Sequence, residues 1–258
     1  MDKSLIKKIK SKREFSELRE IDIEKNFELF SKKQISEEEK ISLTKEQLRK
    51  LFSAFLSKKL LSLKNKPYEW ILRKHISTRE RLPYYDCLYK KLFLNTKDNE
   101  NLTVFDLGAG INGFSYNFFP KNKKIEYICF ESVGQLVDLT NYFFKKNNIN
   151  GKCFHLSLFE LEEIKKIIKE KKGKKIVFLF KIIDALESVE LDYSKKLIFE
   201  LMPLIDEIVL SFSTKSLGGK NKFKVDRRWI LNFIKENFDV LEEFEFGNEK
   251  YIVFKSHN

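Results

Sequence analysis

The chain has 258 residues, of which 42% are hydrophobic and 34% are charged, and its formal net charge is +12. This hydrophobic fraction is sufficient for a folded core and excludes a disordered polyelectrolyte. Residues 1–100 contain 25 basic and 16 acidic side chains, which accounts for +9 of the net charge. Because a concentrated positive charge attracts polyanions, nucleic acid is the first partner to consider, although many basic proteins only solvate their lysines.

The cysteines and the N-terminus indicate a cellular setting. Cys87, Cys129 and Cys153 are odd in number and show no C-x-x-C spacing, which favours neither a disulfide framework nor a zinc site. The first ten residues are charged throughout, and no apolar run approaches the roughly 18 residues needed to cross a bilayer. We therefore expect a soluble, cytoplasmic protein that binds neither metal nor membrane, and a monomer.

Residues 1–95 predict a helical module. This stretch contains no glycine and favours helix throughout, with Pro67 and Pro83 as the clear interruptions. After a capping pattern at Thr44, apolar residues recur at helical spacing from Leu48 to Leu60, and we interpret this stripe as core. A polar stretch at residues 95–101 then marks the expected boundary with a second domain, residues 96–258.

The second domain shows a different rhythm. Short apolar runs, expected as strands, alternate with helical patterns at residues 133–146, 160–171 and 193–202; the runs are residues 102–107, 125–130, 152–156, 175–181 and 207–212. Such alternation predicts an α/β domain with a parallel sheet covered on both faces. A helix at 227–237 and two strands at 240–246 and 251–255 follow, and the short turn between these strands makes them an antiparallel hairpin. Five parallel strands closed by such a hairpin predict the Rossmann-like class I fold of S-adenosylmethionine (SAM) dependent methyltransferases.

The first strand of this domain leads into a glycine turn, Leu102-Thr-Val-Phe-Asp-Leu-Gly-Ala-Gly-Ile-Asn-Gly113. Gly108 and Gly110 allow close approach of the backbone to a ligand. With Gly113 they also satisfy the G-x-G-x-x-G pattern, so an NAD enzyme is an alternative. Asp106 suits a cofactor with a positive amino group better than a pyrophosphate, and Glu131, after the second strand, suits a ribose diol. The structural alternative is that Asp106 caps the turn and Glu131 lies on the surface.

Four segments resemble the aminoglycoside-resistance 16S rRNA guanine-N7 methyltransferases. Arg73-Lys-His-Ile-Ser-Thr-Arg-Glu-Arg-Leu-Pro83 is similar to that family's H-x-S-T-x-E-R-L segment, and Val177-Phe-Leu-Phe-Lys-Ile-Ile-Asp-Ala-Leu-Glu187 to its L-L-L-K-x-L-P-x-L-E segment. Ser211-Phe-Ser-Thr-Lys-Ser-Leu-Gly-Gly219 resembles S-F-P-x-x-S-L-G-G, and Gly247-Asn-Glu-Lys-Tyr251 resembles G-N-E-x-Y. Together they span about residues 70 to 255 in the family's order.

The resemblance implies roles for individual residues. It implies that SAM is the cofactor and that its site is formed by a set of residues near the strand ends: His75, Arg79, Asp106, Gly108, Ala109, Gly110, Glu131, Ser132, Ser157, Leu158, Lys181 and Ile182. It implies that Arg79, Lys181 and Lys215 act in catalysis. The expected RNA-binding residues are Lys215, Ser216, Gly218, Gly219, Lys220, Lys222, Arg227 and Arg228. The helical module would dock on the small ribosomal subunit or its 16S rRNA near the decoding site.

The chain also departs from the family's pattern. Asp184 and Ser213 replace usual prolines, and Ser157 stands where an Asp near the adenine is expected. These departures affect the identity of the target nucleotide rather than the fold. The same residues also have interpretations without a functional role. His75 would lie on a helix surface, Arg79 and Arg81 would form a solvated basic face, and residues 215–228 would form a solvated loop.

Guanine N7 carries a free lone pair, so its methylation requires no general base, and the sequence offers no evident acid–base pair. The resemblance implies guanine N7 in 16S rRNA as the target, and the absence of such a pair is compatible with it, so an enzyme of this kind is the leading interpretation. The alternatives are a tRNA guanine methyltransferase, a catalytically idle RNA-binding protein that retains the SAM fold, and a small-molecule methyltransferase, which the basic N-terminal module disfavours.

Overall fold

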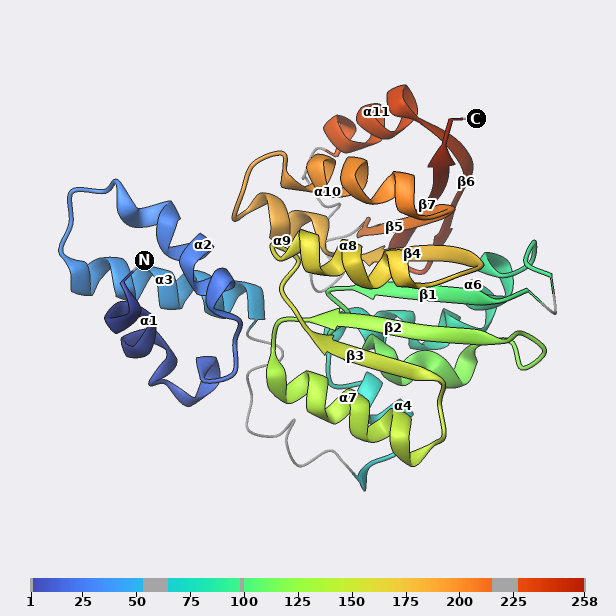
Figure 1. Ribbon diagram of the computed structural model, residues 1–258, viewed down its shortest axis with the longest axis horizontal. Helices are drawn as coiled ribbons and strands as arrows, with labels where there is room; N and C mark the ends of the chain where they lie inside the picture. Colours follow the sequence, from blue (N-terminus) through green and yellow to red (C-terminus); the bar gives the residue numbers. More distant parts are fainter. Residues whose placement is uncertain (1, 53–64, 98–99, 215–226, 258) are drawn as a thin grey trace.

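The computed structural model describes residues 2–52, 65–97, 100–214 and 227–257 (Figure 1). A seven-stranded sheet in the order β3-β2-β1-β4-β5-β7-β6 forms its centre. The strands are β1 (Leu102–Leu107), β2 (Ile125–Glu131), β3 (Gly151–His155), β4 (Lys174–Phe180), β5 (Glu207–Ser213), β6 (Phe238–Phe246) and β7 (Glu249–Ser256). β1 to β5 are parallel, whereas β7 is antiparallel to both β5 and β6.

The helices that follow residue 65 cover the sheet on both faces. They are α4 (Tyr68–Leu72), α5 (Ile76–Arg81), α6 (Tyr85–Leu92), α7 (Gly134–Lys146), α8 (Leu161–Glu170), α9 (Ile183–Glu187), α10 (Tyr193–Leu201) and α11 (Arg228–Asn237). In Figure 1, α8, α10 and α11 lie on one side of the sheet, and α4, α6 and α7 lie on the other. Side chains alternate between the faces: Val104 of β1 joins the core beneath α6 and α7, while Phe105 joins the core beneath α8 and α10. This burial on both faces explains why the central strands are almost continuously apolar.

The expected order of elements is confirmed. All five parallel strands and the C-terminal hairpin form within about two residues of their predicted bounds, as do the four helices expected between residues 133 and 237. The fold is the α/β class I SAM-dependent methyltransferase architecture. What distinguishes it from a dinucleotide-binding domain is β7, an antiparallel strand inserted between β5 and β6.

Helices α4 to α6 pack on the sheet rather than forming part of a separate module. Tyr85 and Tyr89 are fully buried, and the Tyr89 ring stacks on Phe178 of β4 with centroids 6.2 Å apart. These helices therefore share a core with the sheet, while the boundary at residue 95 stays a prediction. Residues 1–52 contain 14 basic and 11 acidic side chains, so most of the positive charge of the first 100 residues follows this helical module.

The helical module consists of α1 (Lys3–Lys10), α2 (Glu20–Ser31) and α3 (Glu37–Phe52). It lies beside the carboxyl ends of β1 and β2 (Figure 1). Its backbone pairs with the segment that follows β2: Leu18 forms an isolated bridge with Val133, and the Gly134 N–H donates to the Glu17 carbonyl at 3.0 Å. Lys25 adds an ion pair with Glu190 at 2.8 Å. The module is therefore docked over the edge of the sheet where doubly wound folds bind their ligands.

Candidate active site

A cavity of about 90 Å³ lies at this edge. Its walls come from the ends of β1, β2 and β4, the segment after β3, helix α9 and, from the helical module, α2 and α3. The lining residues are Asp22, Asn26, Leu51, Phe52, Gly108, Phe130, Glu131, Ser132, Leu156, Leu158, Phe159, Ile182, Ala185, Leu186 and Val189. The strand order reverses between β1 and β4, and such a switch point opens a crevice between the loops that leave the two strands.

The glycine turn after β1 forms one wall of the cavity. Gly108 and Gly110 have positive φ values of 68° and 55°. A Cβ atom on Gly108 would lie 2.8 Å from Cδ1 of Ile182, the movable end of that side chain, so the positive φ is the main reason for glycine here. The Gly110 N–H donates to Oε2 of Glu131 at 2.8 Å, and the Val133 N–H donates to Oε1 at 2.9 Å.

Glu131 is buried in this wall, and burial raises the pKa of its carboxyl to about 7 despite the two backbone hydrogen bonds. Each carboxylate oxygen has two acceptor positions, so each can still accept a hydrogen bond from a ligand hydroxyl. The structural alternative of a surface glutamate is therefore wrong. The predicted contact with a ribose diol stays a prediction that this geometry supports.

Asp106 lies behind the glycine turn and does not line the cavity. Its side chain is 1% exposed, and its Oδ2 accepts hydrogen bonds from the Tyr127 hydroxyl and, at 2.7 Å, from Nδ2 of Asn112. Burial raises the pKa of Asp106 to about 6, while both hydrogen bonds lower it. In this structure Asp106 fixes the turn from inside, and its contact with a cofactor amino group stays a prediction.

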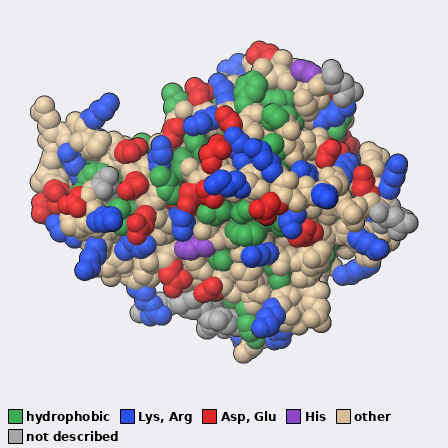
Figure 2. Space-filling view, viewed as in Figure 1, with side chains coloured by type: hydrophobic (Ala, Val, Ile, Leu, Met, Phe, Trp, Pro, Cys, Tyr) green, Lys and Arg blue, Asp and Glu red, His purple; other side chains and the backbone are tan. Residues whose placement is uncertain are grey.

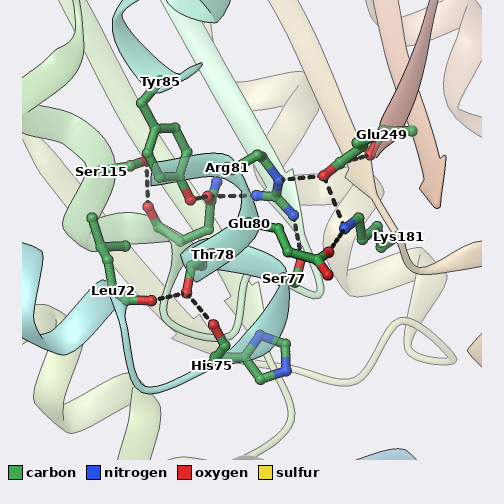
Figure 3. A network of polar contacts seen from close by, with 12 residues as sticks. Leu72, His75, Ser77, Thr78, Glu80, Arg81, Tyr85, Ser115, Lys181 and Glu249 are labelled. Atoms are coloured by element: carbon green, nitrogen blue, oxygen red, sulfur yellow. Dashed lines mark hydrogen bonds and ion pairs between the residues drawn. The ribbon is translucent and has the colours of Figure 1, made fainter. Parts of the chain in front are cut away.

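A buried polar network joins α5 to the C-terminal hairpin (Figure 3). Nε of Arg81 donates to Oε2 of Glu249 at 3.0 Å, and Nη1 donates to Oδ1 of Asn112 at 2.8 Å. The Lys181 ammonium group pairs with Glu249 at 3.1 Å and with Glu80 at 2.8 Å. Although burial raises the pKa of Glu249, Arg81 and Lys181 outweigh this effect and hold it below its ordinary value.

Three residues that the family resemblance marks as functional belong to or surround this network. Lys181 has a positive φ of 55°, and its side chain is largely buried between the two glutamates. His75 is half-buried, and burial together with the charges of Arg81, Lys181 and Arg79 lowers the pKa of its imidazole to about 4. Arg79 is exposed, whereas Arg81 is 3% exposed, so the alternative of a solvated basic face is wrong for Arg81.

Most of the expected RNA-binding loop lies outside the described residues, namely Lys215, Ser216, Gly218, Gly219, Lys220 and Lys222. Arg228, the first residue of α11, is exposed. Arg227 is only 7% exposed: its guanidinium pairs with Asp184 at 2.5 Å and lies over the Phe212 ring. Asp184 thus serves as a partner for Arg227 at a position where the family usually has proline.

The structure brings five predicted cofactor residues together in the cavity wall: Gly108, Glu131, Ser132, Leu158 and Ile182. Ala109 and Gly110 continue the glycine turn, and Ser157 is buried behind the wall. The sequence did not reveal Asp22 and Asn26, which reach the cavity from α2 of the helical module. Their spacing of four residues places them on one helix face, but only the docked structure shows that this face meets the sheet.

Among the described residues, no group of three or more His, Cys, Asp or Glu side chains is arranged to hold a metal ion. In the same part of the chain, no helix is both long and apolar enough to cross a membrane. Cys87, Cys129 and Cys153 are free thiols.

Sheet order, glycine turn and cavity together define the class of protein: this is a class I SAM-dependent methyltransferase fold with an added helical module. Within that class, the sequence is similar to the 16S rRNA (guanine(1405)-N(7))-methyltransferases. It is 24% identical to the protein of Proteus mirabilis over 191 residues and 23% identical to that of Micromonospora rosea over 188 residues. These matches cover 71% and 70% of this chain but 63% of each relative, so the chain matches less than two thirds of their length. No family model matches the chain.

Solved structures agree in fold. The 16S rRNA methyltransferase RmtF in complex with S-adenosyl-L-homocysteine superposes with a TM-score of 0.78 at 16% identity, covering all of both chains. The rRNA methylase from Escherichia coli gives a TM-score of 0.77 at 16% identity over 98% of this chain and 99% of that one. The 16S rRNA methylase ArmA gives 0.60 at 24% identity, over 77% of this chain and 97% of its own.

Proposed function

We propose that this protein is a SAM-dependent methyltransferase that modifies N7 of a guanine in the 16S rRNA of the small ribosomal subunit. The observation that carries the proposal is the similarity to curated 16S rRNA (guanine-N7) methyltransferases over about 190 residues, 70–71% of the chain. The cavity at the β1/β4 switch point supplies the site for the cofactor.

The residues around the cavity fit SAM. The glycine turn leaves room for close backbone approach, and Glu131 offers carboxylate oxygens to a ribose diol. Phe130, Leu158 and Ile182 offer an apolar surface to a purine ring. A cavity of about 90 Å³ is smaller than typical ligand sites of about 300–1,000 Å³, so binding of SAM requires the cavity to widen.

When bound, SAM supplies an electrophilic methyl group on a positively charged sulfonium. The chain's own task is to align guanine N7 with that methyl group, because the N7 lone pair needs no base to deprotonate it. We assign this orienting role to Lys181, Arg79 and Lys215. Because N7 faces the deep, narrow groove of A-form RNA, the protein is expected to take the target base out of the stack.

RNA contact is assigned to three regions: the helical module, the basic residues 53–100 that follow it, and the residues of the 215–228 stretch named above. On the face drawn in Figure 2, basic and acidic side chains are intermingled rather than gathered into one basic patch. The proposal therefore rests on the sequence relatives more than on the overall charge. It also places the protein in the cytoplasm as a monomer, where ribosomal subunits provide the substrate.

The test is incubation with labelled SAM and one of three substrates: intact small subunits, bare 16S rRNA or tRNA. We expect 7-methylguanosine in digested rRNA by mass spectrometry. Borohydride and aniline cleavage at that nucleoside should give a primer-extension stop that depends on both protein and SAM. Methylation of tRNA alone would favour the tRNA enzyme. Tight RNA binding without SAM binding would favour an idle RNA-binding protein, and a methyl group on adenine, ribose or a small metabolite would refute the proposal.

A further inference from the structure

Helix α2 of the docked module places two buried polar side chains in the cavity wall. Asp22 is 4% exposed and Asn26 is 1% exposed, and they lie one helical turn apart. Nδ2 of Asn26 donates to the carbonyl of Asp22 at 2.7 Å, which turns the amide oxygen of Asn26 the other way. The hydroxyl of Ser157, after β3, donates to Oδ1 of Asp22 at 2.8 Å.

One acceptor atom on each side chain remains without a partner. Oδ2 of Asp22 and Oδ1 of Asn26 are buried and have no hydrogen-bond partner among the described residues. Leaving buried polar atoms unpaired costs about 1–3 kcal/mol each, so native proteins rarely retain them without a reason. Both residues line the same cavity, and both orphan atoms are acceptors. By distance and angle neither atom has a protein donor, although the Ser132 hydroxyl lies in the same wall and interacts with the Asp22 carboxylate, so a ligand amino group with two N–H bonds can donate to both.

The surrounding residues indicate which amino group this is. Glu131, the expected ribose contact, lines the same cavity as Phe130, Leu158 and Ile182, whose apolar side chains suit the base attached to that ribose. Asp22 and Asn26 add polar edge contacts to this apolar part. An Asp near the adenine was expected at the position of Ser157. Ser157 has no carboxylate, but its hydroxyl donates a hydrogen bond to the carboxylate of Asp22.

We propose that Asp22 and Asn26 recognise the exocyclic amine of adenine, with Oδ2 of Asp22 and Oδ1 of Asn26 each accepting one of its hydrogens. This inference rests on the proposed use of SAM. The carboxylate that reads the adenine then comes from the helical module across the domain interface, and Ser157 is a positioning residue for it. Recognition of the cofactor depends on docking of α2, which the Arg19–Glu160 and Lys25–Glu190 ion pairs fasten on either side of Asp22.

The test is calorimetric binding of S-adenosylhomocysteine and of S-inosylhomocysteine, in which a carbonyl oxygen replaces the amine. The wild-type protein should prefer the adenosyl compound by about 10- to 100-fold, since the inosyl oxygen would face two acceptors. Asp22→Asn keeps the size of the side chain but offers an amide. This variant should bind S-adenosylhomocysteine about tenfold more weakly and should lose most of the preference.

Glu20→Gln is the matched control, because it makes the same carboxylate-to-amide change on α2 at an exposed position that does not line the cavity. It should leave the ratio of the two affinities unchanged. An equal loss for both ligands in Asp22→Asn would show that Asp22 only docks the module, and an unchanged preference would also overturn the inference. Circular dichroism and thermal unfolding of each variant exclude misfolding as the cause. If the wild-type protein binds neither compound, the SAM proposal fails and this inference fails with it; binding of S-adenosylhomocysteine without discrimination refutes this inference alone.

Discussion

Replacing Arg81 with methionine should destabilise the protein strongly. Arg81 and Glu249 are 3% and 2% exposed, and their ion pair joins α5 to β7. Removing one partner of a buried pair costs about 3–5 kcal/mol, because the other charge stays buried. Lys181, which pairs with Glu249 at 3.1 Å, remains in the variant. We therefore expect a loss of unfolding free energy at the lower end of this range, about 3 kcal/mol. For a chain of this length, that corresponds to a decrease of roughly 6–12 °C in melting temperature.

A double-mutant cycle with Glu249→Gln, followed by urea and thermal unfolding, measures the coupling. Each single variant should lower the free energy of unfolding substantially. The double variant Arg81→Met/Glu249→Gln should lower it by clearly less than the sum of the two single losses, since neither charge is left uncompensated. Lys90→Met is the control, because Lys90 forms an exposed i,i+4 pair with Asp86 on the adjacent helix α6 and should change little. Additive costs, or a loss below about 1 kcal/mol for Arg81→Met, would refute the role assigned to this pair.

Three further predictions concern the cavity. Glu131→Gln should weaken binding of S-adenosylhomocysteine by about 1–3 kcal/mol through lost ribose hydrogen bonds, and equal affinity in calorimetry would contradict the assignment. Gly108→Ala should lower the free energy of unfolding by about 1–2 kcal/mol, because alanine disfavours the positive φ; a wild-type denaturation midpoint would count against this. Burial raises the pKa of Glu131 to about 7 and the pKa values of Asp22 and Asp106 to about 6, so the folded state binds protons more tightly than the unfolded chain. His75, whose pKa burial lowers to about 4, opposes this effect below about pH 6.5, but it is one group against three. Stability of the ligand-free protein should therefore rise as the pH falls from about 7.5 to about 5, with a shallower rise in Glu131→Gln.

The sequence was sufficient to predict the sheet because its signals are local. Continuous apolar runs such as that of β4 identify strands buried on both faces, and Gly108 and Gly110 identify the turn where the ligand site begins. The Gly247 turn identifies the closing hairpin. These patterns depend only on residues that are neighbours in the sequence, so they can be recognised without knowledge of tertiary contacts.

The parts that were missed depend on packing between distant segments. Helix α6 has the pattern of any amphipathic helix, and nothing in it shows that Tyr89 meets β4 rather than the N-terminal helices. Arg79 and Arg81 are two residues apart, yet one is solvated and the other pairs with a glutamate 168 residues away. Asp22 reads as one charge among many on a helix, and only docking against Ser157 gives it a place in the site.

The segment that follows β2 serves two partners at once. Glu131, the last residue of β2, supplies the acceptors proposed for the cofactor, while Ser132, Val133 and Gly134 pair with the backbone of residues 17–19. A change in how the helical module sits therefore acts directly on the peptide that positions Glu131. If ribosomal RNA shifts the module toward its docked arrangement, it must raise the affinity for the cofactor, and the bound cofactor must raise the affinity for RNA by the same factor. Such reciprocity would favour loading of both substrates before the methyl group is transferred.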